Sequence, residues 1–209
     1  MQFALTILKD ACVKKKYIDT LSTPASLSYF ATAFTDPSYD ENNNYLFLRA
    51  LGTVSLHKTL VWYLVKKFPH VNQKTLTQIK INLLRDSEIG KFVETLGIAD
   101  HILHDPKMKK TVKLSQNVFE AIIGAIEFLI NANYKMGIGN VVVTKLCSYV
   151  LDQLQIVADE SLLENFKTKL KELYFDRNKM THELQTVHTK DADNLVACRP
   201  VGNLLPSLG

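Results

Sequence analysis

Two long apolar runs dominate the hydrophobic pattern of the chain. The first spans residues 45–68, YLFLRALGTVSLHKTLVWYLVKKF, and the second spans residues 117–130, NVFEAIIGAIEFLI. Both are apolar nearly all round, which is typical of helices buried at the centre of a domain. Each contains a glycine, Gly52 or Gly124, although glycine costs a helix interior about 1 kcal/mol relative to alanine. We therefore predict that the two helices pack against each other near these glycines.

Four polar positions within these helices are the candidate functional residues. Arg49 and Thr53 are four residues apart, and Asn117 and Glu120 are three apart, so each pair shares one face of its helix. The predicted crossing would bring the four side chains together. A buried charge needs a partner, and the simplest interpretation is a structural ion pair between Arg49 and Glu120.

Further helical patterns surround the central pair and indicate an all-α domain up to about residue 157. We predict an amphipathic helix over residues 2–17 and a helix that begins at Pro24 after the start signal Ser22-Thr23. Asn44 is placed to cap the first central helix. Other helices are predicted within residues 72–86, 87–97 and 140–155.

The character of the chain changes after residue 157. A charged amphipathic helix is predicted over residues 162–175, followed by THELQTV and NLVAC, two short runs of strand-like composition. The tail PVGNLLPSLG has too many breakers for regular structure. We predict a helical domain over residues 1–157, and a helix, short strands and an irregular tail over residues 158–209.

Composition fits a globular domain with an appendage. The chain has 209 residues, of which 46% are hydrophobic and 22% charged, and its net charge of +4 permits a polyanionic partner without requiring one. Cys12, Cys147 and Cys198 lie far apart, which favours neither a disulfide framework nor a zinc site. No run reaches transmembrane length, so no membrane span is predicted. No signal peptide is evident, although a targeting segment could have been removed from a mature form.

Two lysine clusters are candidate phosphate contacts, although a solvated surface is the commonest meaning of such clusters. The candidate phosphate-binding residues are Lys107, Lys109, Lys110 and Lys113 in the first cluster, and Lys167, Lys169 and Lys171 in the second.

Four segments, in this order, resemble the motifs of a ribonuclease III domain. They are AFTDPSY, LRALGTVSL, LTQIKINLLRDSEIGKFVETLGI and NVFEAIIGAIEFLI. The resemblance extends over residues 30–151 and implies an all-α, ribonuclease III-like helical domain. The segment after residue 157 is similar to the opening of a double-stranded-RNA-binding domain, truncated before the basic helix that contacts phosphates.

The chain departs from the family at the positions that carry the chemistry. Enzymes of the family hold Mg²⁺ with four carboxylates and hydrolyse a phosphodiester in double-stranded RNA. The resemblance equates those carboxylates with Arg49, Thr53, Asn117 and Glu120, of which only Glu120 is acidic. An arginine stays protonated and repels Mg²⁺. This implies that the chain is not an enzyme, holds no metal or other cofactor, and uses Arg49 as the counter-ion of Glu120.

The resemblance also suggests a partner. The family pairs its domains through the signature helix, where an aromatic residue commonly fills a hole in the partner, and the equivalent residue here is Ala50. A heterodimer with another ribonuclease III-like chain is therefore expected at least as readily as a homodimer.

Ribonuclease III-like domains without their carboxylates occur in the large subunit of mitochondrial ribosomes, especially in fungi. Similarity to that group implies a non-catalytic structural protein of the mitochondrial matrix, which binds rRNA, a ribonuclease III-like neighbour and other ribosomal proteins. The alternative is an inactive pseudo-nuclease subunit of an RNA-processing complex, paired with an active ribonuclease III-like chain. An active nuclease with rebuilt chemistry and a helical interaction protein without an RNA role are further alternatives.

Overall fold

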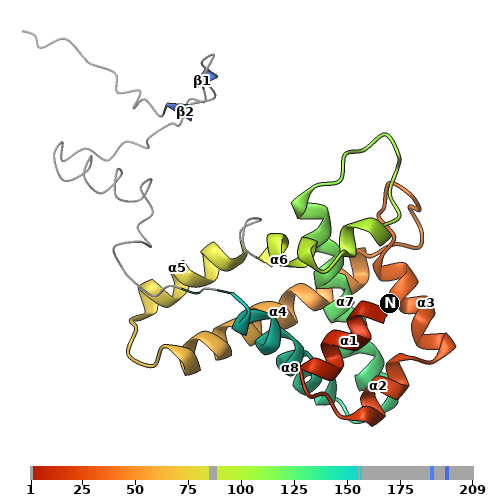
Figure 1. Ribbon diagram of the computed structural model, residues 1–209, viewed down its shortest axis with the longest axis horizontal. Coiled ribbons are helices and arrows are strands. Elements are labelled where there is room, and N and C mark those ends of the chain that lie inside the picture. The colour runs from red at the N-terminus through yellow and green to blue at the C-terminus, as the bar shows by residue number, and fades with distance from the viewer. Residues whose placement is uncertain (1, 85–88, 155, 157–188, 191–195, 198–209) are drawn as a thin grey trace, which may run out of the picture. The chain divides into compact units, whose positions relative to one another are not determined.

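Two long helices lie at the centre of the computed structural model, which describes residues 2–84, 89–154, 156, 189–190 and 196–197. The helices of the described residues are α1 (Gln2–Asp10), α2 (Lys15–Leu21), α3 (Pro24–Ala33), α4 (Leu46–Lys67), α5 (Gln73–Leu84), α6 (Ile89–Thr95), the 3-10 helix η1 (Ile98–His101), α7 (Val112–Asn133) and α8 (Ile138–Asp152) (Figure 1). The central helix α7 packs against α2, α3, α4, α6, α8 and η1. The predicted all-α architecture of this domain is confirmed.

Helices α4 and α7 cross at the two glycines, as the sequence predicts. A Cβ atom added to Gly52 would overlap the backbone carbonyl oxygen of Glu120, and one added to Gly124 would overlap that of Leu48. Only glycine permits such a close approach of two helix backbones. The crossing therefore fixes how the turn that carries Glu120 lies against α4.

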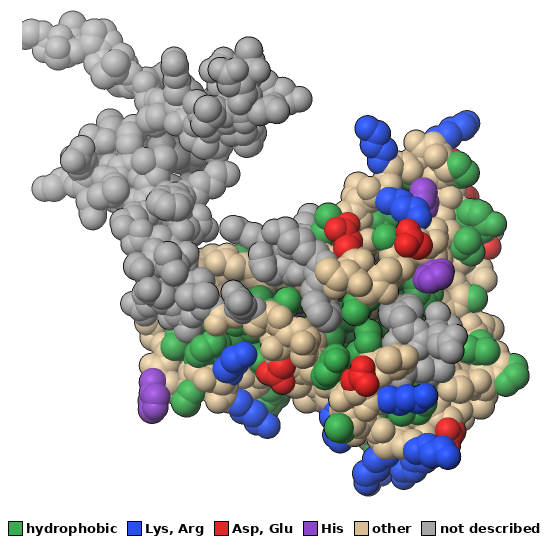
Figure 2. Space-filling model, in the orientation of Figure 1, with side chains coloured by type: hydrophobic (Ala, Val, Ile, Leu, Met, Phe, Trp, Pro, Cys, Tyr) green, Lys and Arg blue, Asp and Glu red, His purple; other side chains and the backbone are tan. Residues whose placement is uncertain are grey.

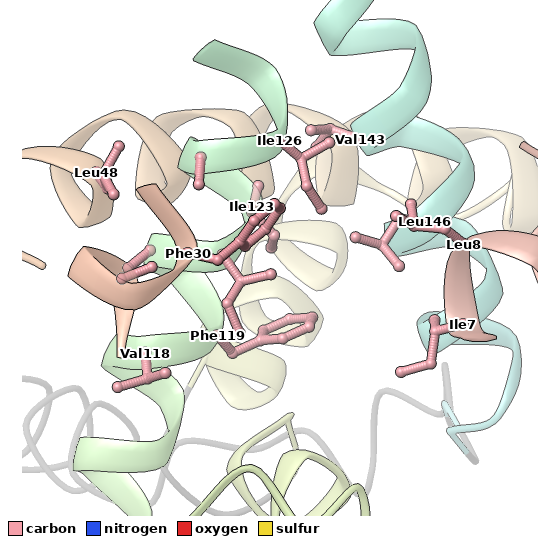
Figure 3. Close-up of a cluster of buried hydrophobic side chains, with 14 of the residues drawn as sticks. Ile7, Leu8, Phe30, Leu48, Val118, Phe119, Ile123, Ile126, Val143 and Leu146 are labelled. Carbon is pink, nitrogen blue, oxygen red and sulfur yellow. The ribbon is translucent and has the colours of Figure 1, made fainter. Parts of the chain in front are cut away.

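The hydrophobic core surrounds α7 on almost all sides. Most residues from Ser115 to Ile130 of this helix are buried, including the polar Gln116 and Glu120. Figure 3 shows a part of this core in which side chains of α1, α3, α4, α7 and α8 meet; the labelled residues are Ile7, Leu8, Phe30, Leu48, Val118, Phe119, Ile123, Ile126, Val143 and Leu146. Because α7 is enclosed, its polar side chains must find partners within the protein.

The prediction of one helix over residues 2–17 is wrong, because α1 ends at Asp10 and α2 starts at Lys15. Cys12 adopts a left-handed conformation with φ of 53°, and the amide of Val13 donates to the carbonyl of Leu8 (3.0 Å). This is a Schellman motif, in which Leu8 and Val13 are both buried. The break allows the apolar residues on both sides of it to face the core.

Other predicted boundaries agree closely with the structure. The hydroxyl of Thr23 accepts a hydrogen bond from the amide of Ser26 (3.3 Å), and Pro24 opens α3. The side chain of Asn44 accepts one from the amide of Leu46 (3.1 Å) at the start of α4. Helix α8 spans residues 138–152 rather than 140–155. Among the described residues, no helix is long and apolar enough to cross a membrane.

The contacts divide the chain into units of residues 1–163 and 164–209. In the second unit, β1 (Thr189–Lys190) pairs antiparallel with β2 (Val196–Ala197), which lies in the predicted strand NLVAC. The helix predicted over residues 162–175 and the run THELQTV lie outside the described residues. The predicted boundary at residue 157 stays a prediction.

Candidate functional site

The candidate site is centred on the Glu120 carboxylate, which lies against α4. Nε of Arg49 lies 3.3 Å from Oε2 of Glu120, so the predicted ion pair is present. The Glu120 side chain is only 5% exposed, whereas the Arg49 side chain is 34% exposed. The pair is therefore buried on its acidic side and open to solvent on its basic side.

Two further side chains hold the same carboxylate. The hydroxyl of Thr53 donates to Oε2 of Glu120 (2.7 Å), and Nε2 of Gln116 donates to Oε1 (3.1 Å). Gln116 also donates to the backbone carbonyl of Leu84 in α5 (3.2 Å), which ties that helix to the site. Both carboxylate oxygens are thus hydrogen-bonded, as a buried charge requires.

Asn117 belongs to a separate hydrogen-bond chain. Its Nδ2 donates to the hydroxyl of Tyr45 (3.3 Å), and that hydroxyl donates to Oδ2 of Asp36 (2.8 Å). Burial raises the pKa of Asp36, but hydrogen bonds from Ser38 and Tyr45 outweigh it, so the pKa of this carboxyl is lower than its usual value. The predicted meeting of four side chains therefore holds for Arg49, Thr53 and Glu120, while Asn117 joins α7 to the loop before α4.

His57 extends the polar face of α4 beyond Thr53 by one helical turn. Burial lowers the pKa of His57; the Glu120 carboxylate raises it, the Lys80 ammonium of α5 lowers it, and the net shift is downward. A neutral imidazole is favoured there at neutral pH. The α4 face beside Glu120 thus carries Arg49, Thr53 and His57, with Lys80 nearby.

The side chains at this site do not fit a magnesium ion. Mg²⁺ requires oxygen ligands in near-octahedral geometry and is usually held by carboxylates. Glu120 supplies the sole carboxylate of the four positions, and the Arg49 guanidinium lies against it. Within the described part of the chain, no group of three or more His, Cys, Asp or Glu side chains is arranged to hold a metal.

Two acceptor atoms next to Glu120 are buried without a hydrogen-bond partner among the described residues. They are Oε1 of Gln116 and Oδ1 of Asn117. A buried acceptor without a donor costs about 1–3 kcal/mol. The α7 side of the site therefore carries hydrogen-bond acceptors, the side-chain oxygens of Gln116, Asn117 and Glu120, and the α4 side carries the Arg49 cation.

The first predicted lysine cluster lies before and at the start of α7, and the second lies outside the described residues. Lys107, Lys109, Lys110 and Lys113 are exposed in the loop before α7 and in its first turn, and Nζ of Lys110 donates to the carbonyl of Ala99 (2.7 Å). Lys167, Lys169 and Lys171 lie outside the described residues. Ala50 is exposed on α4, as a contact residue would be.

Sequence reasoning missed several side chains that shape the site. Gln116 precedes Glu120 by four residues, and this spacing alone was enough to place it beside the carboxylate. His57 continues the four-residue spacing of Arg49 and Thr53 along α4. Asp36 gave no such signal, because a tertiary contact brings it to Tyr45.

Comparisons with known proteins agree with the fold. No family model matches the chain. Its sequence is 26% identical over 216 residues to a putative ribonuclease 3 of Invertebrate iridescent virus 6, covering 93% of this chain and 74% of the relative. It is 27% identical to a putative ribonuclease 3 of Frog virus 3, covering 77% of this chain and 45% of the relative. A ribonuclease 3 of Nitratiruptor is 29% identical, with 67% of this chain and 61% of that relative covered.

Solved structures show the same architecture. The nuclease domain of ribonuclease III from Campylobacter jejuni superposes with a TM-score of 0.52 at 20% sequence identity, covering 64% of this chain and 94% of that domain. A second structure of that domain gives the same TM-score over 69% of this chain.

The relatives correct one prediction. The expectation that the chain is not an enzyme is contradicted, because the relatives described above are named for a ribonuclease. That expectation relied on the absence of a carboxylate at three of the four positions, and this absence does not decide whether the protein takes part in cleavage. A place in the mitochondrial ribosome, with rRNA and ribosomal neighbours, stays a prediction.

Proposed function

We propose that this chain is a subunit of a ribonuclease III-type enzyme that acts on double-stranded RNA. In this proposal Arg49 contacts the RNA backbone directly, and a second ribonuclease III-like chain binds along α4. The relatives named ribonuclease 3 support RNA as the substrate, and the resemblance to the family's motifs suggests a duplex. The open side of the Arg49–Glu120 pair is the single observation that carries the role of Arg49.

Arg49 is suited to a phosphate because its guanidinium is only partly used. The Glu120 carboxylate accepts from Nε, which leaves the two terminal nitrogens as donors on a side chain that is 34% exposed. A guanidinium binds phosphate oxygens in a bidentate fork and stays charged at any relevant pH. Glu120 holds the Arg49 side chain from the protein side, and Thr53 and Gln116 in turn hold the Glu120 carboxylate.

The proposed partner surface is an exposed apolar stripe on α4. It consists of Phe47, Val54, Val61 and Val65, whose spacing of seven and four residues places them on one face, with the exposed Lys58 between Val54 and Val61. Phe47 is 66% exposed and Val54 is 67% exposed, which is unusual for side chains of this size at the centre of a domain. The stripe extends for about 27 Å along the helix, the length of a helix-to-helix interface. A second ribonuclease III-like chain would bury the stripe against its own signature helix.

The test is duplex RNA binding and cleavage by the chain, alone and with a ribonuclease III-like chain of the same organism. We expect the pair to cleave duplex RNA with Mg²⁺. We expect Arg49→Met/Glu120→Gln, which leaves no buried charge unpaired, to bind duplex RNA about tenfold more weakly. Thr53→Val is the control, since it removes a contact to Glu120 but no phosphate donor. The proposal would be overturned by wild-type affinity in the double variant, or by a pair of chains that neither binds nor cleaves duplex RNA.

A further inference from the structure

A second group of cations lies around Tyr134, at the C-terminal end of α7. Its members come from the start of α2, the turn after α7 and the middle of α8, and all are exposed: Lys14, Lys15, Lys16, Lys135 and Lys145. Figure 2 shows Lys and Arg side chains gathered over α2. We call these five residues the Tyr134 lysine surface. They lie far apart in the sequence, and the fold alone brings them together.

Specific contacts hold this surface in place. The hydroxyl of Tyr134 lies 2.9 Å from that of Thr20 and donates to the carbonyl of Lys16 (3.2 Å). Nζ of Lys16 lies 4.9 Å from the ring centroid of Tyr17 and 5.4 Å from that of Tyr134. Nζ of Lys145 donates to the carbonyl of Cys12 (2.9 Å), which fastens α8 to the turn before α2.

The charge of this region is strongly unbalanced. Residues 9–21 and 134–145 contain six lysines and two aspartates, Asp10 and Asp19. Lysines held together by the fold repel one another, and a bound polyanion relieves that repulsion. Within the part of the chain that the structure describes, the ammonium groups of Lys15 and Lys135 are exposed and form no salt bridge with a carboxylate. Their ammonium groups are therefore available to an anion.

We infer that the Tyr134 lysine surface is a second binding site for the phosphate backbone of duplex RNA. This inference rests on the proposed function for the identity of the polyanion. Glu120 and Tyr134 are fourteen residues apart along α7, or about 21 Å, so this surface is distinct from the Arg49 site. Lysine contacts to phosphates set the position of a duplex and add salt-dependent affinity without reading its sequence.

An anionic membrane is the main competing source of phosphate groups. Peripheral membrane helices present an exposed apolar face beside their cations. In α2 the apolar residues Ile18 and Leu21 are buried in the core, so that face is absent from this helix. Met136 beside Lys135 and Val141 one helical turn before Lys145 are exposed, but they lie on separate elements and do not form one apolar helix face. The observations therefore favour a nucleic-acid backbone.

The experiment is a salt titration of binding to a labelled duplex RNA with the full chain. We expect Lys15→Glu/Lys135→Glu to lower the affinity at least about tenfold, and to reduce the slope of log K against log salt by about two. The matched control is Lys66→Glu/Lys74→Glu, which makes the same charge change on exposed lysines of α4 and α5. Circular dichroism checks that both variants are folded.

The outcomes separate this inference from the proposed function. If the wild type does not bind duplex RNA, both fail. If Arg49→Met/Glu120→Gln weakens binding while Lys15→Glu/Lys135→Glu does not, only the second site is overturned. Equal losses in the lysine variant and its control would show a general charge effect and also overturn it. Binding to phosphatidylserine vesicles that this variant loses, with RNA affinity unchanged, would assign the surface to a membrane instead.

Discussion

Gly52 of α4 and Gly124 of α7 lie opposite each other at the point where the two helices come closest. A Cβ atom on Gly52 would lie 2.7 Å from the amide nitrogen of Gly124, and one on Gly124 would lie 2.9 Å from that of Gly52. Real Cβ atoms essentially never approach backbone atoms so closely. Arg49 and Thr53 reach Glu120 because the two backbones touch here. The geometry of the site therefore depends on two residues that have no side chain.

Replacing Gly52 with alanine should destabilise the domain by about 3 kcal/mol or more, because the overlap is with backbone that cannot move aside. Urea unfolding followed by circular dichroism measures the loss. Gly137→Ala is the control: its backbone is left-handed, with φ of 93°, but the space around it is open. We expect a cost of about 1 kcal/mol there. A loss at Gly52 no larger than at Gly137 would contradict the close crossing.

Arg49→Met should lower the free energy of unfolding by about 1–2 kcal/mol, since it leaves the buried Glu120 carboxylate without its cation. The loss is smaller than for a fully buried pair because Arg49 is partly exposed to solvent. Glu120→Gln should recover part of the stability in the Arg49→Met background, and a double-mutant cycle gives the coupling energy. Additive effects of the two substitutions would mean that the pair contributes nothing.

Magnesium should leave the melting temperature of the wild type unchanged, because the Glu120 carboxylate is already occupied by Arg49, Thr53 and Gln116. The variant Arg49→Glu/Thr53→Asp places two further carboxylates beside Glu120. We expect this variant to be less stable without metal and to gain several degrees with Mg²⁺, since a ligand bound only by the native state stabilises it. Scanning calorimetry with Mg²⁺ and with EDTA tests both. A rise in the wild type would show that Mg²⁺ binds the folded protein.

The central helices and their contact could be predicted because their signals are local. An apolar run interrupted by one glycine indicates both a buried helix and a close neighbour, and Gly52 and Gly124 meet accordingly. The spacing of Arg49 and Thr53 likewise predicted a shared face, which the structure confirms. Such features depend on the helical period alone.

The features that were missed depend on tertiary contacts. Nothing near Cys12 signals a helix end, because the residue that takes the left-handed conformation there is not glycine. The predicted helix over residues 2–17 places Lys14, Lys15 and Lys16 in its last turn, whereas Lys14 precedes α2 and Lys15 and Lys16 open it beside Tyr134. Asp36 and Tyr45 meet through a loop whose course the pattern of residues does not specify.

The two described cysteines should differ sharply in reactivity. Cys12 is exposed, whereas Cys147 is buried, and burial together with the Glu127 carboxylate raises the pKa of Cys147 to about 12. In a Cys198→Ser background, which removes the thiol outside the described residues, a thiol reagent at neutral pH should modify one cysteine fast. Cys12 should be the fast one, and Cys147 should react only when the protein unfolds.

The raised pKa of Cys147 also predicts a pH dependence of stability. Its folded pKa lies above the ordinary 9.0, so the protonated thiol is favoured by the fold. Its contribution is complete below about pH 9 and is lost as the pH rises toward 12. Cys147→Ala should therefore flatten the alkaline limb of a plot of unfolding free energy against pH. An unchanged limb in this variant would contradict the assignment.

Val54 tests the proposed interface, because it lies near the middle of the exposed stripe on α4 and is 67% exposed. Val54→Lys should abolish binding to a ribonuclease III-like partner chain, since it places an ammonium group in an apolar contact that excludes water. The stability of the free chain should change by less than about 0.5 kcal/mol, as for other surface positions. Val141→Lys is the matched control, a valine of α8 that is 57% exposed and lies outside the stripe. Analytical ultracentrifugation of the mixed chains gives the result. Pairing that survives Val54→Lys would reject the stripe as the interface, and self-association of the wild type that is lost in Val54→Lys would identify a second copy as the occupant.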